Sequence, residues 1–172
     1  DEYRNISYPK VIILGNGDDD WHDFNFNLPH SVRRVLLQNS FIPNDKRFLG
    51  IPIGVENARL ARNGLPHLFG DSYVIRAKVP QVLLGPFGDT HRIRSQINET
   101  DYSSSEFVRV LQKRLSSLEM ARLMSKHQFV GAPRGNGRDT HRVWEALYRG
   151  AVPIVTFDGW TANMLELGVP LR

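Results

Sequence analysis

The segment Phe129–Val155 constrains the fold of this chain more than any other part of its sequence. It reads as a buried strand, a glycine-rich turn at Arg134–Gly137, a helix and a second strand. The glycines of the turn can take positive φ and let a ligand approach the backbone. Asp139 and Thr140 stand at the expected helix start, where their side chains would cap free N–H groups, and Gly150 is expected to end the helix. Such a unit predicts a parallel α/β sheet.

Basic side chains gather at the same turn, which makes it a candidate anion site. Arg134, Arg138 and Arg142 flank the expected helix start, whose first N–H groups and dipole also favour a phosphate. A solvated basic face is the alternative. Glu145 lies three residues after Arg142 on the same helix face and could accept hydrogen bonds from ribose hydroxyls. Its alternative role is an ion pair with Arg142 or Arg149.

Composition restricts the classes of protein to which the chain can belong. Of the 172 residues, 41% are hydrophobic and 23% are charged, which is ordinary for a globular protein. The net charge of +4 suits an anionic small ligand, and without a basic run that interleaves aromatic residues we expect no nucleic-acid partner. The absence of cysteine excludes disulfide frameworks and cysteine zinc sites. No apolar run reaches the ~20 residues that span a bilayer.

Apolar runs between turn signals predict the other elements. Short buried strands are expected at Lys10–Leu14, Phe48–Gly54 and Val79–Leu84. Val32–Leu37 is compatible with a strand or a helix, and Asn63–Asp71 reads as a connection. Ser103–Ser125 has helical spacing. Its apolar stripe, best explained by core packing, comprises Phe107, Val110, Leu111, Leu115, Leu118 and Leu123. Strands that alternate with helices predict a layered α/β fold with a mostly parallel sheet.

A short sequence occurs twice. Asp89–Arg94 (DTHRIR) matches Asp139–Trp144 (DTHRVW), and each copy follows a strand and a glycine-containing turn. If both units belong to one sheet, both helix starts lie along its carboxyl edge, where open α/β sheets bind ligands. Coincidence combined with ordinary helix capping is the alternative. His141, within the second copy, is either a ligand contact or a bystander.

Acidic and histidine side chains in the first part of the chain are candidates for catalytic chemistry. Asp18–Asp20 directly follows the first expected strand and could hold a divalent metal that bridges a diphosphate. The same run could be a solvated turn or contain a general base. We take Asp20, His22 and Glu56 as candidate proton acceptors. Residue types alone leave these alternatives open.

The segment PRGNGRDTHRVWEALYRGAVPIV resembles the exostosin-type glycosyltransferases and their bacterial relatives. In that family a Gly-rich loop, an arginine and an acidic residue on one helix, and a G-x-x-P-[VI]-[VI] strand build the nucleotide-sugar pocket. The segments VLLGPFGDTHRIR and IPIGVEN are similar to further parts of the family. The resemblance implies the GT-B architecture, in which two Rossmann-like lobes hold the donor mainly through the second. It also implies catalysis without a bound metal or other cofactor.

Under this resemblance, residues 1–72 would form part of an acceptor-side lobe and residues 78–172 the nucleotide-sugar-binding lobe. Arg142 would face the donor diphosphate and Glu145 the ribose. The expected donor-binding residues are Arg94, Arg134, Gly135, Asn136, Gly137, Asp139, Thr140, Arg142 and Glu145. The donor would be a nucleoside-diphosphate sugar, and the acceptor a hydroxyl of a glycan, as in polysaccharide biosynthesis. The resemblance does not identify the general base.

Two other functions stay open at this point. One is a metal-dependent GT-A glycosyltransferase that uses Asp18–Asp20, and the other is a non-catalytic nucleotide- or glycan-binding module. The chain starts DEYRNISYPK and ends MLELGVPLR, so we expect a fragment of a longer protein that transfers sugar poorly by itself. Its compartment would be the cytoplasm in a bacterium and the Golgi lumen in a eukaryote.

Overall fold

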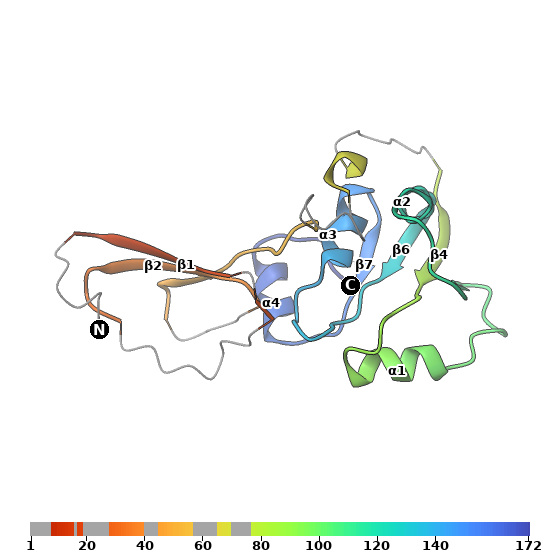
Figure 1. The fold of residues 1–172 in the computed structure, drawn as a ribbon, viewed down its shortest axis with the longest axis horizontal. Helices are drawn as coiled ribbons and strands as arrows, with labels where there is room; N and C mark the ends of the chain where they lie inside the picture. Colours follow the sequence, from red (N-terminus) through yellow and green to blue (C-terminus); the bar gives the residue numbers. More distant parts are fainter. Residues whose placement is uncertain (1–7, 16, 19–27, 40–44, 57–64, 70–76) are drawn as a thin grey trace.

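The computed structural model describes residues 8–15, 17–18, 28–39, 45–56, 65–69 and 77–172. These parts form two parallel sheets with helices beside them, at opposite ends of the long axis in Figure 1. This confirms the predicted α/β class and a Rossmann-like parallel sheet flanked by helices. The assignment of the two sheets to the two lobes of a GT-B protein stays a prediction.

The first sheet contains β1 (Lys10–Leu14), β2 (Val32–Leu37) and β3 (Phe48–Gly50), in the order β1-β2-β3. The ambiguous segment Val32–Leu37 is therefore a strand. Its core consists of Val32, Val35 and Leu37, with Ile12, Leu14, Leu28 and Phe48 packed against them. The strand expected at Phe48–Gly54 is shorter, because Pro52 has no N–H to donate to a ladder.

The second sheet contains β4 (Val79–Leu84), β5 (Val108–Val110), β6 (His127–Gly131) and β7 (Val152–Ile154). Their order is β5-β4-β6-β7, and neighbouring strands are parallel. The unit predicted from the glycine-rich segment is present as β6, helix α3 (His141–Tyr148) and β7. Gly150 follows α3 with a φ of +65°, a conformation that favours glycine, as expected for the residue that ends the helix.

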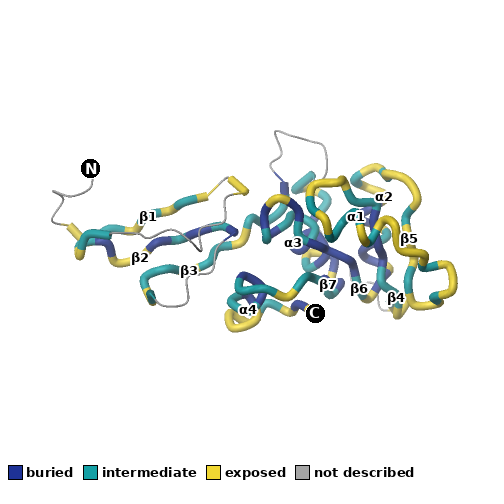
Figure 2. The backbone as a smooth tube through the Cα atoms, turned by 90° about the horizontal axis from the view of Figure 1, so that it is seen from below, coloured by how far each residue is buried: buried dark blue, intermediate teal, exposed yellow. Residues whose placement is uncertain are grey.

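Three further α-helices accompany the second sheet: α1 (Arg92–Glu99), α2 (Ser117–Lys126) and α4 (Gly159–Glu166). One core joins β4, β6, α2 and α3, and contains Leu83, Met120, Ala121, Met124, Val130, Ala146 and Ala151. A second core lies between α3 and α4, and contains Ala132, Val143, Trp160, Met164 and Leu171. Figure 2 shows the buried backbone concentrated around β6, β7 and α3. This packing fixes the start of α3 relative to the sheet.

The long helix predicted at Ser103–Ser125 is wrong. The segment contains β5, which pairs with β4 through Val82–Val108 and Leu84–Val110, and only its end is helical. Helix α2 begins after Ser116, whose hydroxyl accepts from the amide of Glu119 while the Glu119 carboxylate accepts from the amide of Ser116. The apolar spacing was misleading because Phe107 and Leu118 are exposed rather than part of one buried stripe.

The expected connection at Asn63–Asp71 contains the short 3₁₀ helix η2 (Pro66–Phe69), and Phe69 joins the core beneath α2 and α3. No helix in the described ranges is both long and apolar enough to cross a membrane.

Candidate functional site

The repeated sequence lies at one edge of the second sheet. Strands β4 and β6 are parallel neighbours, and the turns that follow them lead into α1 and α3. The prediction that both helix starts share the carboxyl edge is therefore confirmed. A cleft of about 780 Å³ opens at this edge. It also reaches the first sheet's connections, since Asp18 and Ile53 contribute to its lining.

The turn before α3 contains most of the expected donor-binding residues. Gly135, Asn136, Gly137, Asp139 and Thr140 all line the cleft. The positive φ expected at the turn glycines is absent: among described glycines it occurs at Gly54, Gly85, Gly150 and Gly168. Glycine is needed at this turn because neighbouring side chains leave no room for a Cβ atom. A Cβ at Gly135 would lie 3.0 Å from Nη2 of Arg94, and one at Gly137 would lie 2.7 Å from Oδ1 of Asn39.

The predicted side-chain caps of α3 are absent. Thr140 is the N-cap residue but makes no side-chain cap, and its buried Oγ1 has no hydrogen-bond partner. The Asp139 carboxylate accepts hydrogen bonds from two other groups. Its Oδ2 accepts from the amide of Ile53 at 2.7 Å, and its Oδ1 accepts from Nε1 of Trp144 at 2.7 Å. Asp139 thus ties the turn to the connection that follows β3.

Burial dominates the electrostatics of Asp139, which is 2% exposed. It raises the pKa of this carboxyl from the usual 3.8 to about 7, against the opposing effects of the two N–H donors and of nearby His141. The group therefore titrates near neutrality at a position that joins the two halves of the described structure.

Arg142 and Glu145 lie together on the cleft side of α3. Nε of Arg142 donates to Oε2 of Glu145 at 3.0 Å, so the ion-pair alternative for Glu145 is present in the structure. The pair leaves the other oxygen unsatisfied. The side chain of Glu145 is 3% exposed, and its buried Oε1 has no hydrogen-bond partner. A buried acceptor without a donor is costly, and a ligand hydroxyl group would satisfy it.

Arg94 faces the same cleft from α1 and braces the turn. It donates from Nε to the Arg134 carbonyl, from Nη2 to the Pro133 carbonyl and from Nη1 to Oγ1 of Thr90. All three acceptors are neutral. Burial and the like charge of Arg142 lower the pKa of Arg94. These two guanidinium groups line the same cleft, and a bound anion would relieve their repulsion.

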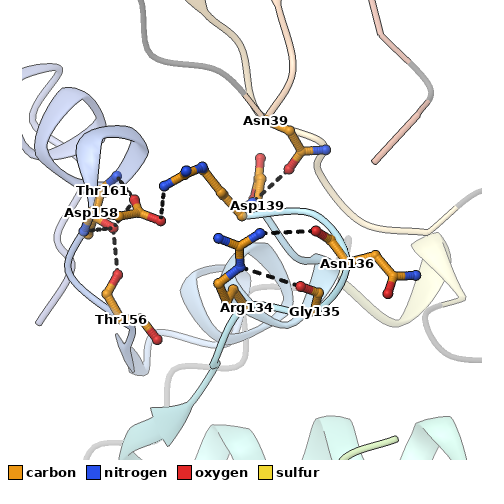
Figure 3. A network of polar contacts seen from close by, with 9 residues as sticks. Asn39, Arg134, Gly135, Asn136, Asp139, Thr156, Asp158 and Thr161 are labelled. Atoms are coloured by element: carbon orange, nitrogen blue, oxygen red, sulfur yellow. Dashed lines mark hydrogen bonds and ion pairs between the residues drawn. The ribbon is translucent and has the colours of Figure 1, made fainter. Parts of the chain in front are cut away.

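The other two arginines of the predicted cluster are engaged elsewhere; Figure 3 shows the contacts of Arg134 within its own turn. The Arg134 side chain folds back onto its own turn, where its Nη2 donates to the Asn136 carbonyl at 3.1 Å. Arg138 pairs with Asp158 at 2.9 Å, and Asp158 caps α4 through the amide of Thr161. Neither is among the described residues that line the cleft, so Arg134 contributes through its backbone carbonyl rather than its charge.

The predicted catalytic candidates are only partly visible. Asp20 and His22, as well as Asp19, lie outside the described residues. Asp18 lines the cleft. Glu56 is 7% exposed and does not appear in the described lining of the cleft. Within the described ranges, no three His, Asp or Glu side chains come together as a metal site requires.

Several cleft residues escaped the sequence analysis. The connection between β5 and α2 contributes Gln112, Lys113, Arg114 and Leu115. It was overlooked because β5 itself was read as helix. His141, which the sequence leaves open as a ligand contact or a bystander, also lines the cleft, and its Nδ1 lies 2.7 Å from the Gly54 carbonyl oxygen. A carbonyl only accepts, so Nδ1 carries the proton in this contact. The repeated DTHR sequence was the available signal for His141.

No protein-family model matches the chain, and a search of curated proteins finds no match.

Proposed function

We propose that the chain binds a nucleoside-diphosphate sugar in this cleft and belongs to a glycosyltransferase of the exostosin type with GT-B architecture. The reaction would transfer the sugar to a hydroxyl of a glycan. The observation that carries the proposal is the Arg142–Glu145 pair: both residues line the cleft, one is positively charged, and the other has a buried oxygen without a hydrogen-bond partner. The Arg142 guanidinium would bind a diphosphate, and the free oxygen of Glu145 would accept a hydrogen bond from a ribose hydroxyl.

The diphosphate would lie near Arg142 and the start of α3, where the side chain of the N-cap residue Thr140 makes no cap hydrogen bond. Arg94 and Lys113 also line this cleft, so at least three cationic side chains surround the space. The leaving diphosphate gains negative charge as the bond to the sugar breaks, and fixed positive groups stabilise that charge. Arg94 is held by three neutral acceptors, which keeps its charge in place before the ligand arrives.

The ribose would lie against Glu145. A carboxylate oxygen accepts hydrogen bonds and donates none, so it is matched by vicinal hydroxyl groups. The pair with Arg142 occupies Oε2 and leaves Oε1 for this role. The acceptor hydroxyl would enter from the side of the first sheet, where Asp18 lines the cleft and where Asp20 and His22 follow in sequence. Asp20, His22 and Glu56 stay the candidate bases.

A thermal-shift panel tests the proposal. UDP-, GDP-, CMP- and dTDP-sugars are added with and without EDTA, since a ligand that binds the folded state raises its stability by mass action. We expect a shift with at least one nucleotide sugar, unchanged by EDTA. A shift that EDTA abolishes would favour a metal-dependent enzyme that uses Asp18. No shift with any member of the panel would contradict the proposal.

Turnover then separates an enzyme from a binding module. Mass spectrometry of donor and acceptor after incubation with the nucleotide sugar that binds reports transfer directly. A glycosyltransferase should consume donor and yield glycosylated acceptor. Binding without any donor consumption would support a non-catalytic nucleotide-binding module instead.

A further inference from the structure

Asn39 connects the first sheet to the turn before α3 without lining the cleft. It lies just after β2, is 1% exposed and has a φ of 55°, in the left-handed region that asparagine tolerates better than most residues. Both ends of its amide are engaged. Oδ1 accepts from the backbone amide of Asp139 at 2.7 Å, and Nδ2 donates to the Gly17 carbonyl at 2.9 Å.

The same side chain fixes the turn sterically. The Cα of Gly137 packs against the Asn39 amide so closely that an added Cβ would lie 2.7 Å from Oδ1 and 2.8 Å from Nδ2. Figure 3 shows Asn39 reaching the turn at Asp139, beside Gly135 and Asn136, which line the cleft. The hydrogen bond and the close packing together fix the position of the turn relative to Asn39.

Two further contacts join the connection after β3 to the same short segment. The amide of Ile53 donates to Oδ2 of Asp139, and Nδ1 of His141 donates to the Gly54 carbonyl. The first sheet therefore contacts the segment between Gly137 and His141 at several points. This segment supplies a large part of the cleft lining that lies next to Arg142.

We propose that Asn39 is a positioning residue for anion binding, so that occupation of the cleft and docking of the first sheet stabilise each other. The inference rests on the proposed function only in that the cleft binds a diphosphate. Asn39 holds the turn that contains Gly137 in the position that the ligand needs, and the ligand in turn holds this turn against Asn39. Because such coupling is reciprocal, each event strengthens the other by the same factor.

Calorimetry with inorganic pyrophosphate tests the first half of the proposal. Asn39→Gly removes both amide contacts while glycine adopts the same φ without strain. Val35→Ala is the matched control, because Val35 is fully buried in the same sheet and does not line the cleft. We expect Asn39→Gly to weaken pyrophosphate binding roughly three- to tenfold, the effect of losing one neutral hydrogen bond. Val35→Ala should lower the melting temperature and leave the affinity unchanged.

Equal affinity in the native chain and Asn39→Gly would overturn the inference, as would equal weakening in both variants. Failure of the native chain to bind pyrophosphate would overturn the anion site as well. Loss of sugar transfer alone would bear on the proposed function and not on this coupling.

The reciprocal measurement uses the native chain and needs no variant. Hydrogen exchange of the Ile53 amide, which donates to Asp139, is followed with and without saturating pyrophosphate. Slower exchange of this amide with ligand is expected, while the amide of Val82, which donates to Phe107 on the far side of β4, should change less. Identical exchange of the Ile53 amide in both states would overturn the coupling.

Discussion

Nε of Arg142 lies 3.0 Å from Oε2 of Glu145, while Oε1 of the same carboxylate is buried without a hydrogen-bond partner. The two residues are neighbours on one face of α3 and line the cleft together. A purely structural ion pair would use both oxygens or expose the spare one to water. This arrangement is incomplete without a further donor, and it defines the first two predictions.

Arg142→Ala should weaken binding of a nucleoside diphosphate by about 1.5–3 kcal/mol, because a charge-assisted contact to the diphosphate is lost. Arg142→Lys should recover only part of the affinity, since lysine lacks the bidentate fork. Isothermal calorimetry measures both. Arg122→Ala, an exposed position on α2 that does not line the cleft, controls for the change in net charge. Unchanged affinity in Arg142→Ala would exclude this arginine from the diphosphate site.

Glu145→Gln should reduce the preference for ribose over 2′-deoxyribose nucleotides. Glutamine keeps the shape of the side chain but replaces one accepting oxygen with an NH₂ donor, which does not match a ligand hydroxyl that donates. Affinities for UDP and 2′-deoxy-UDP are compared in the native chain and the variant. If the ratio of the UDP affinity to the 2′-deoxy-UDP affinity is the same in the native chain and the variant, Glu145 acts only as the ion-pair partner of Arg142.

Asp139 should make stability fall as the pH rises. Its pKa is 3.8 in an unfolded chain and about 7 in the fold, so between these values the folded state alone keeps the proton. The stabilisation is complete below pH 3.8 and is lost as the pH rises through 7, on the order of 4 kcal/mol in total. Urea denaturation between pH 4 and 8.5 measures this dependence. Asp139→Asn should flatten it, and an equal slope in both proteins would contradict the prediction.

Gly135→Ala should weaken pyrophosphate binding several-fold and cost about 1–3 kcal/mol of stability, because its Cβ would lie 3.0 Å from Nη2 of Arg94 and force the guanidinium to shift relative to its acceptors. Gly88→Ala is a matched control. Gly88 also lines the cleft, but a Cβ there meets nothing within 4 Å. Thermal unfolding and calorimetry on both variants give the comparison. If the two alanine variants had similar melting temperatures and similar pyrophosphate affinities, close packing at Gly135 would contribute to neither stability nor binding.

The sequence predicted the elements whose signals are local. The β6–α3–β7 unit and its ending at Gly150 follow from an apolar run, a glycine-rich turn and a helical repeat within one short segment. The DTHR repeat placed two helix starts at one edge, because the carboxyl ends of parallel strands in one sheet lie at the same edge. The capping box of Ser116 and Glu119 was equally local and would have separated β5 from α2.

The other errors concern relationships between distant parts of the chain. Asp139 was expected to cap α3, but the amide of Ile53, far away in sequence, attracts its carboxylate. The turn glycines are expected from the sequence to take positive φ. In the structure glycine is needed there because the side chains of Asn39 and Arg94 approach too closely for a Cβ atom. No local pattern reveals which side chain will reach a turn from another sheet. The role of Asn39 therefore became visible only in three dimensions.

The hydrogen bond from Nε1 of Trp144 to Asp139 gives the turn an optical reporter. An indole whose N–H donates to a carboxylate changes its emission when the carboxyl gains a proton or shifts position. The chain has three tryptophans, and Trp160 is buried between α3 and α4. With Trp21 and Trp160 replaced by phenylalanine, the fluorescence of Trp144 would follow both the titration of Asp139 and the arrival of an anion at the turn. The protein can therefore be assayed without a label, a coupled enzyme or a known substrate.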